Sequence, residues 1–77
     1  MFLKMKLRKQ IKQSKDAIAQ LEQKRSRSQA ALVTALLNKE VPNDEEVDYF
    51  NRFSEEIDRE REHLHELTEQ YEALLKK

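Results

Sequence analysis

Apolar residues recur at alternating steps of four and three along two long stretches of this chain. The first stretch runs over residues 2–37 and the second over about 44–76, and neither contains a glycine or a proline. This spacing puts one apolar stripe on a helix, as in helices that pair along a seam. The pattern therefore predicts an all-α fold of two long helices, with Pro42 inside a turn over residues 38–43.

The two seams can be written without a break in the four-three alternation. The first comprises Leu7, Ile11, Ser14, Ile18, Leu21, Arg25, Ser28, Leu32 and Ala35. The second comprises Phe50, Phe53, Ile57, Glu60, Leu64, Leu67, Tyr71 and Leu74. Each seam has one charged residue where an apolar residue is expected, Arg25 in the first and Glu60 in the second.

A chain that folds back on itself places residues opposite each other when their numbers add to a constant. A constant of 85 matches the two seams and brings Arg25 opposite Glu60. It also centres the turn between Pro42 and Asn43. We therefore predict an antiparallel coiled-coil hairpin over residues 1–77, in which Arg25 and Glu60 form a core register pair. The alternative is that both charged side chains extend to water without touching.

Two details support this arrangement. Glu22 and Arg61 flank the charged pair and form a second candidate ion pair. Asn43 and Glu46 have the spacing of a capping box, so Asn43 is predicted to cap the second helix. Asn38 is the candidate for a left-handed residue at the end of the first helix, because asparagine tolerates positive φ better than most residues.

Charge divides the chain into two halves. Residues 1–38 carry nine Lys and Arg against two acidic residues, and residues 39–77 carry six against thirteen. A basic helix followed by an acidic one favours pairing within the chain. The sequence has no cysteine, which excludes a disulfide scaffold and cysteine zinc sites. It also lacks an apolar run long enough to span a membrane and a recognisable secretory signal, so a cytoplasmic protein is expected.

A second contact surface is predicted outside the seam, because a lone hairpin of this size has little core. We name as the hinge-end patch the apolar residues that flank the seam near the turn: Val33, Leu36, Leu37, Val47 and Tyr49. Further apolar residues, Phe2, Leu3, Met5 and Leu75, lie near the termini. Two hairpins packed antiparallel would set each basic end against an acidic end, which predicts a four-helix-bundle homodimer. The alternative is that these are scattered exposed residues, which are common.

Chemistry for catalysis is not evident. The chain has no glycine for a phosphate-binding loop, and His63 and His65 point to different sides of a helix. We expect no enzymatic activity, cofactor or metal. A basic cluster follows the first helix and is a candidate nucleic-acid contact: Lys4, Arg8, Lys9, Lys12 and Lys15. A solvated basic face is the alternative.

The expected function is accordingly that of a non-catalytic interaction or assembly module, a small adaptor that acts as a dimer and has a protein partner. Two alternatives remain open at this point. One is a small nucleic-acid-binding regulator that uses the basic first helix. The other is a non-catalytic accessory subunit of a larger complex.

Overall fold

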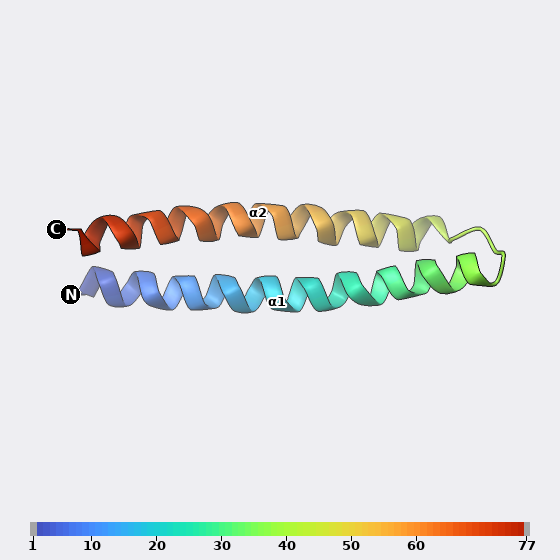
Figure 1. Cartoon of the computed structure of the whole chain (residues 1–77), viewed down its shortest axis with the longest axis horizontal. Helices are drawn as coiled ribbons and strands as arrows, with labels where there is room; N and C mark the ends of the chain where they lie inside the picture. The colour runs from blue at the N-terminus through green and yellow to red at the C-terminus, as the bar shows by residue number, and fades with distance from the viewer. Residues whose placement is uncertain (1, 77) are drawn as a thin grey trace.

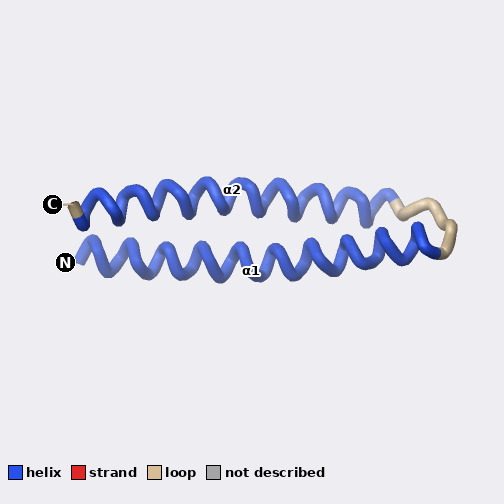
Figure 2. Tube along the Cα trace, in the orientation of Figure 1, coloured by secondary structure: helices blue, strands red, loops and turns tan. Residues whose placement is uncertain are grey.

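The computed structural model describes residues 2–76 and shows a hairpin of two long helices. Helix α1 spans Phe2–Leu37 and helix α2 spans Asp44–Leu75. The helices run antiparallel, so the first and last described residues lie at the same end of a rod measuring 59 × 16 × 14 Å (Figure 1). Residues 2–76 contain no strand (Figure 2). The prediction of an all-α hairpin is therefore confirmed at the level of two helices packed against each other.

Helix α1 ends in a Schellman motif. The N–H of Glu40 donates to the carbonyl oxygen of Ala35 at 2.8 Å, and the N–H of Lys39 donates to that of Leu36 at 3.1 Å. These two bonds satisfy carbonyls that the helix end would leave without partners. They require a left-handed residue between them, and Lys39 has a φ of 60°. The prediction that Asn38 takes this conformation is wrong by one position, because Asn38 still donates to Thr34 in the helical pattern.

The start of α2 is capped as the sequence predicts. Asn43 has an extended backbone, with φ −66° and ψ 135°, and its side-chain oxygen accepts from the N–H of Glu45 at 2.9 Å. Asp44, Glu45 and Glu46 place negative charge in the first turn, where it interacts favourably with the helix dipole. A return bond from the Glu46 side chain, the second half of a capping box, is not among the hydrogen bonds of residues 2–76.

The core is a single narrow stripe between the helices. Its buried apolar residues are Leu7, Ile57 and Leu67, with exposed fractions of 4%, 0% and 5%. Ser14 is buried beside them, while the other seam residues are half-buried. Two helices can shield only one stripe of each other from water. Most of the chain's surface therefore remains accessible.

The register of the two helices differs from the predicted one. The numbers of the contacting pairs Ser14–Glu60, Arg8–Tyr71 and Glu22–Arg61 add to 74, 79 and 83. A constant of 85 would instead set Ser14 level with Tyr71, eleven residues from Glu60, or about 16 Å along the helix. No pair of side chains as short as serine and glutamate spans that distance.

A constant of 78 accounts for these contacts and for the burial. It is one heptad below 85, so the two apolar stripes still face each other. Leu7 then lies level with Tyr71, whereas a constant of 85 would set it beyond the end of α2 and leave it uncovered. Its burial therefore supports the lower register. The heptad pattern alone does not distinguish the two registers, because both keep the seams in contact.

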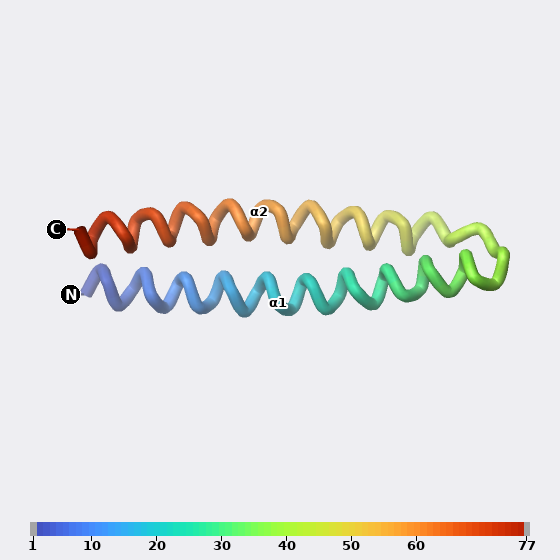
Figure 3. Tube along the Cα trace, in the orientation of Figure 1, coloured from blue at the N-terminus to red at the C-terminus, as the bar shows by residue number. Residues whose placement is uncertain are grey.

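The turn explains why the lower register is adopted. Because the chain reverses at Lys39, the extended segment Glu40–Asn43 runs back toward the other end of the rod before α2 begins. Helix α1 consequently reaches further toward the turn than α2 does (Figure 3). The centre of the hairpin thus lies near Lys39, three to four residues before the predicted centre.

Candidate interaction surfaces

The polar part of the seam joins Ser14 to Glu60. The hydroxyl of Ser14 donates to a carboxylate oxygen of Glu60 at 2.8 Å, and Ser14 itself is 3% exposed. This bond gives a half-buried carboxylate a donor, which offsets part of the cost of removing it from water. Within residues 2–76, no buried side-chain nitrogen or oxygen lacks a partner.

The structure does not bring Arg25 and Glu60 together as the sequence predicts. Within residues 2–76, Arg61 forms a salt bridge with Glu22, and the Nε2 of His65 lies 2.9 Å from a carboxylate oxygen of Glu69; neither contact includes Arg25 or Glu60. The register is the physical reason, since it sets Arg25 and Glu60 seven residues, or about 10 Å, apart along the rod. Arg25 is half-buried and lies level with Phe53 instead.

The flanking pair predicted beside the charged seam positions does form. Arg61 donates to Glu22 at 3.0 Å across the two helices. Long side chains tolerate the changed register, because each reaches several residues along its neighbour. About half of each side chain is exposed, and such pairs contribute only about 0.2–1 kcal/mol.

At the open end of the rod, Arg8 rests on Tyr71. The Nε of Arg8 donates to the phenolic oxygen of Tyr71 at 2.7 Å, and its guanidinium carbon lies 5.8 Å from the ring centroid. That geometry suits a cation–π interaction. The sequence did not predict this contact, because a constant of 85 sets Tyr71 level with Ser14. All five candidate nucleic-acid contacts, Lys4, Arg8, Lys9, Lys12 and Lys15, are exposed, and Arg8 differs from the four lysines in its contact with Tyr71.

The hinge-end patch remains exposed in the hairpin. Leu36 and Leu37 are 64% and 78% exposed, and Val33 and Val47 are also accessible. Tyr49 stacks on Phe53 with ring centroids 6.4 Å apart, so one of its faces is partly covered. Beside these predicted residues, the turn exposes 93% of Val41, which sequence reasoning did not single out. Val41 directly follows the Schellman motif and lies in the turn before α2.

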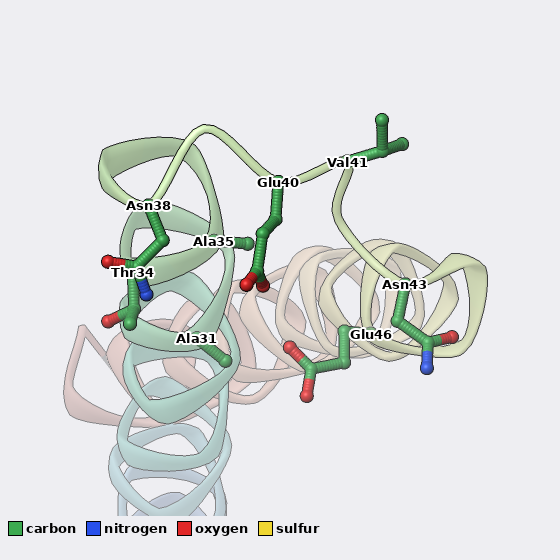
Figure 4. Close-up of a pocket in the computed structure, with 8 residues that line it drawn as sticks. All are labelled: Ala31, Thr34, Ala35, Asn38, Glu40, Val41, Asn43 and Glu46. Carbon is green, nitrogen blue, oxygen red and sulfur yellow. The ribbon is translucent and has the colours of Figure 1, made fainter.

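A shallow cleft of about 380 Å³ lies where the turn meets both helices (Figure 4). Ala31 and Ala35 line it from α1, and the side chains of Glu40 and Glu46 extend into the space between the helices (Figure 4). The remaining lining residues are Thr34, Asn38, Val41 and Asn43. The cleft is thus lined by small side chains on α1 and is acidic. Its lining thus combines residues of α1, of the turn and of the first turn of α2.

The open end carries a contrasting surface. Phe2 is 83% exposed, and Leu3, Met5 and Leu75 are also accessible. Phe2 and Met5 line a hollow together with Lys6 and Lys9, so apolar and cationic groups alternate there. Lys76 adds positive charge nearby, whereas Lys77, also expected at this end, lies outside the described residues. The end of the rod at the turn, here called the tip, is therefore acidic. The open end, here called the base, is positively charged. Both ends carry exposed apolar side chains.

No group of three or more His, Cys, Asp or Glu side chains is placed to hold a metal ion in residues 2–76. His65 and Glu69 do meet, at 2.9 Å, but on an exposed helix face. Neither described helix is long and apolar enough to cross a membrane.

Comparison of the chain with protein-family models, with curated proteins and with solved structures found no match.

Proposed function

We propose that this protein is a non-catalytic interaction module that pairs with a second copy of itself and acts as a small adaptor. The observation that carries the proposal is the exposure of large apolar side chains at both ends of the rod, outside the seam that joins the helices. A group of exposed apolar residues, as found at each end, is typical of a contact surface. The dimer is a four-helix bundle with the supercoiled packing of a coiled coil.

Charge supports a particular arrangement of the two copies. The tip carries Glu40, Asp44, Glu45 and Glu46, while the base carries Lys4, Lys6 and Lys9. In a side-by-side antiparallel dimer, each acidic tip lies over a basic base. The same arrangement brings the hinge-end patch of one copy toward Phe2, Met5 and Leu75 of the other. A two-fold axis makes both contacts at once, as in most homodimers.

The narrow core also favours a second copy. Only four residues of the described chain are buried, and a chain of 77 residues gains little stability from so small a core. Packing a second hairpin against the first would bury a further stripe on each helix. We therefore expect the folded hairpin and the dimer to be thermodynamically linked.

Light scattering after gel filtration tests the dimer. We expect twice the chain mass of 9.2 kDa at micromolar concentration. Replacing Leu37→Asp together with Tyr49→Asp should shift the mass toward that of one chain. Gln23→Asp is the matched control, because it adds charge to an exposed position on α1 away from the hinge-end patch. A single-chain mass for the unmodified protein across the micromolar range would refute the dimer.

A partner protein is sought with the same variants. The adaptor role predicts that a partner co-purifies with the unmodified protein from its source cell and is lost with Leu37→Asp and Tyr49→Asp but retained with Gln23→Asp. A stable stoichiometric assembly of higher native mass would instead favour the accessory-subunit role, which uses the same surfaces.

Nucleic-acid binding is the second candidate function, favoured by four exposed lysines along α1: Lys4, Lys9, Lys12 and Lys15. Binding through them should weaken steeply with salt, because each phosphate contact releases a counterion. The charge-reversing pair Lys9→Glu and Lys12→Glu should abolish it. An electrophoretic shift assay with single- and double-stranded DNA and RNA at low salt measures this, and no shift with any probe would exclude this function.

A further inference from the structure

The seams of α1 and α2 fit together in a second register. Both seams repeat every seven residues, so raising the pairing constant from 78 to 85 keeps the two stripes face to face. The chain then slides by seven residues, or about 10 Å, along the rod. In that second register Arg25 lies level with Glu60, and the small residues Ser28 and Ala35 lie level with Ile57 and Phe50. Ile57 and Phe50 thus each meet a small residue.

The observed register leaves one charge of the seam without an opposite charge. Arg25 is half-buried, and no ion pair of residues 2–76 includes it. Glu60 has a neutral hydroxyl, that of Ser14, as its partner. A partly buried charge is stabilised most by an opposite charge in hydrogen-bonding reach. The second register supplies that partner to both residues.

The turn can accommodate the slide. In the observed register Lys39 has positive φ, a conformation that crowds the Cβ of any residue except glycine. Nothing in residues 38–40 prevents α1 from continuing, because the helix-breaking residue, Pro42, comes later. Extending α1 to Glu40 would return Lys39 to helical geometry and leave Val41–Asn43 as the connection. Loops of two to five residues commonly join antiparallel helices.

The open end favours the observed register. Leu7 is 4% exposed there, and Arg8 is bound to Tyr71. In the second register Phe2–Lys9 would extend beyond α2, so Leu7 would lose its cover and Arg8 its partner. The turn and the open end therefore favour different registers. The observed register buries Leu7, but it strains Lys39 and leaves Arg25 unpaired.

We propose that the hairpin slides between these two registers, and that the slide separates the basic, apolar segment Phe2–Lys9 from α2. The observed register is the ground state. Movement of one helix past another by whole turns is an established form of switching. The state of the turn is thereby coupled to the base of the rod.

Distances between spin labels test the slide directly. The chain has no cysteine, so labels attach only at introduced ones. One doubly labelled chain carries Gln13→Cys and Glu55→Cys, and another carries Ala30→Cys and Glu62→Cys; all four positions are exposed. The slide moves the first pair further apart and the second pair closer together, each by up to about 10 Å. Dilution with unlabelled chain removes distances between copies.

Leu7→Ala and Lys39→Gly bias the equilibrium in opposite directions. Leu7→Ala removes burial that exists only in the observed register, so it should populate the second register. The distance between labels at Gln13 and Glu55 should then lengthen, and the distance between labels at Ala30 and Glu62 should shorten. Leu3→Ala is the matched control, because Leu3 is already exposed. Lys39→Gly relieves the strain at the turn and should reduce the second register in the Leu7→Ala background.

Two outcomes would overturn the proposal. Unchanged distances in Leu7→Ala for both pairs would mean that the hairpin has one register. Lengthening of both pairs would mean that the helices separate rather than slide. Opposite changes in the two pairs, reversed by Lys39→Gly, would establish the second register. These measurements do not depend on the dimer or adaptor role, which could fail independently.

Discussion

The two ends of the rod are held together by different means. At the hinge, the helices are joined by the turn and secured by backbone bonds: the Schellman pair at Lys39 and Glu40, and the cap at Asn43. No residue of that end is buried. At the open end no covalent link exists, and packing of Leu7, Ser14 and Leu67 holds the helices. The comparison indicates that a hairpin needs its core most where the chain itself does not join the helices.

The sharpest test replaces a core leucine and an exposed one of equal size. Leu67→Ala should destabilise the hairpin by about 2–5 kcal/mol, because it removes a buried side chain and leaves a cavity. Leu37→Ala, at the exposed hinge end, should change stability by less than about 0.5 kcal/mol. Urea unfolding followed by circular dichroism, at matched chain concentration, measures both. Equal effects would show that the hinge end contains a core of its own, supplied by a second copy.

A smaller effect is expected from the polar bond in the seam. Ser14→Ala removes the donor to the Glu60 carboxylate, which should lower stability by about 1.5 kcal/mol. Ser26→Ala on the exposed side of α1 is the control and should be neutral. The same unfolding experiment measures the difference between them. If Ser14→Ala were as stable as Ser26→Ala, the Glu60 carboxylate would be fully solvated and its bond to Ser14 would contribute nothing to stability.

The smallest effect should come from the cap. Asn43→Ala removes the bond to the N–H of Glu45 and should cost about 1 kcal/mol. Asn51→Ala, within α2 and exposed, should be neutral or slightly stabilising, because alanine favours helix. Thermal unfolding of the two variants provides the comparison. A loss for Asn43→Ala as large as that for Leu67→Ala would mean that the caps, rather than the core, dominate stability.

Much of the fold could be predicted because it depends on local pattern. The helix ends and the Asn43 cap are set by residues close together in sequence. The register could not be predicted, because seams that repeat every seven residues fit equally well one heptad apart. The choice depends on Lys39, a residue that does not usually take positive φ, so the reversal point was placed too late. The error separated Arg25 from Glu60 and concealed the contact between Arg8 and Tyr71.

The candidate surfaces divide in the same way. The exposure of Leu36 and Leu37 follows from their position outside the seam, and this depends only on helical spacing. The exposure of Val41 and the cleft beside it depend on the path of Glu40–Asn43, which only the folded turn reveals. The sequence thus predicts which residues lie on the exposed face of a helix, but it does not predict the shape of the turn.

The start of α1 and the end of α2 lie at one end of the rod. The turn lies at the other end, 59 Å away along the long axis. Two fluorescent proteins fused to the two ends of the chain would therefore sit side by side. Energy transfer between them would report whether the helices are together. A binding site at the turn would stay clear of both fusions. The molecule can in this way be anchored and labelled at one end, while the turn at the other end stays accessible.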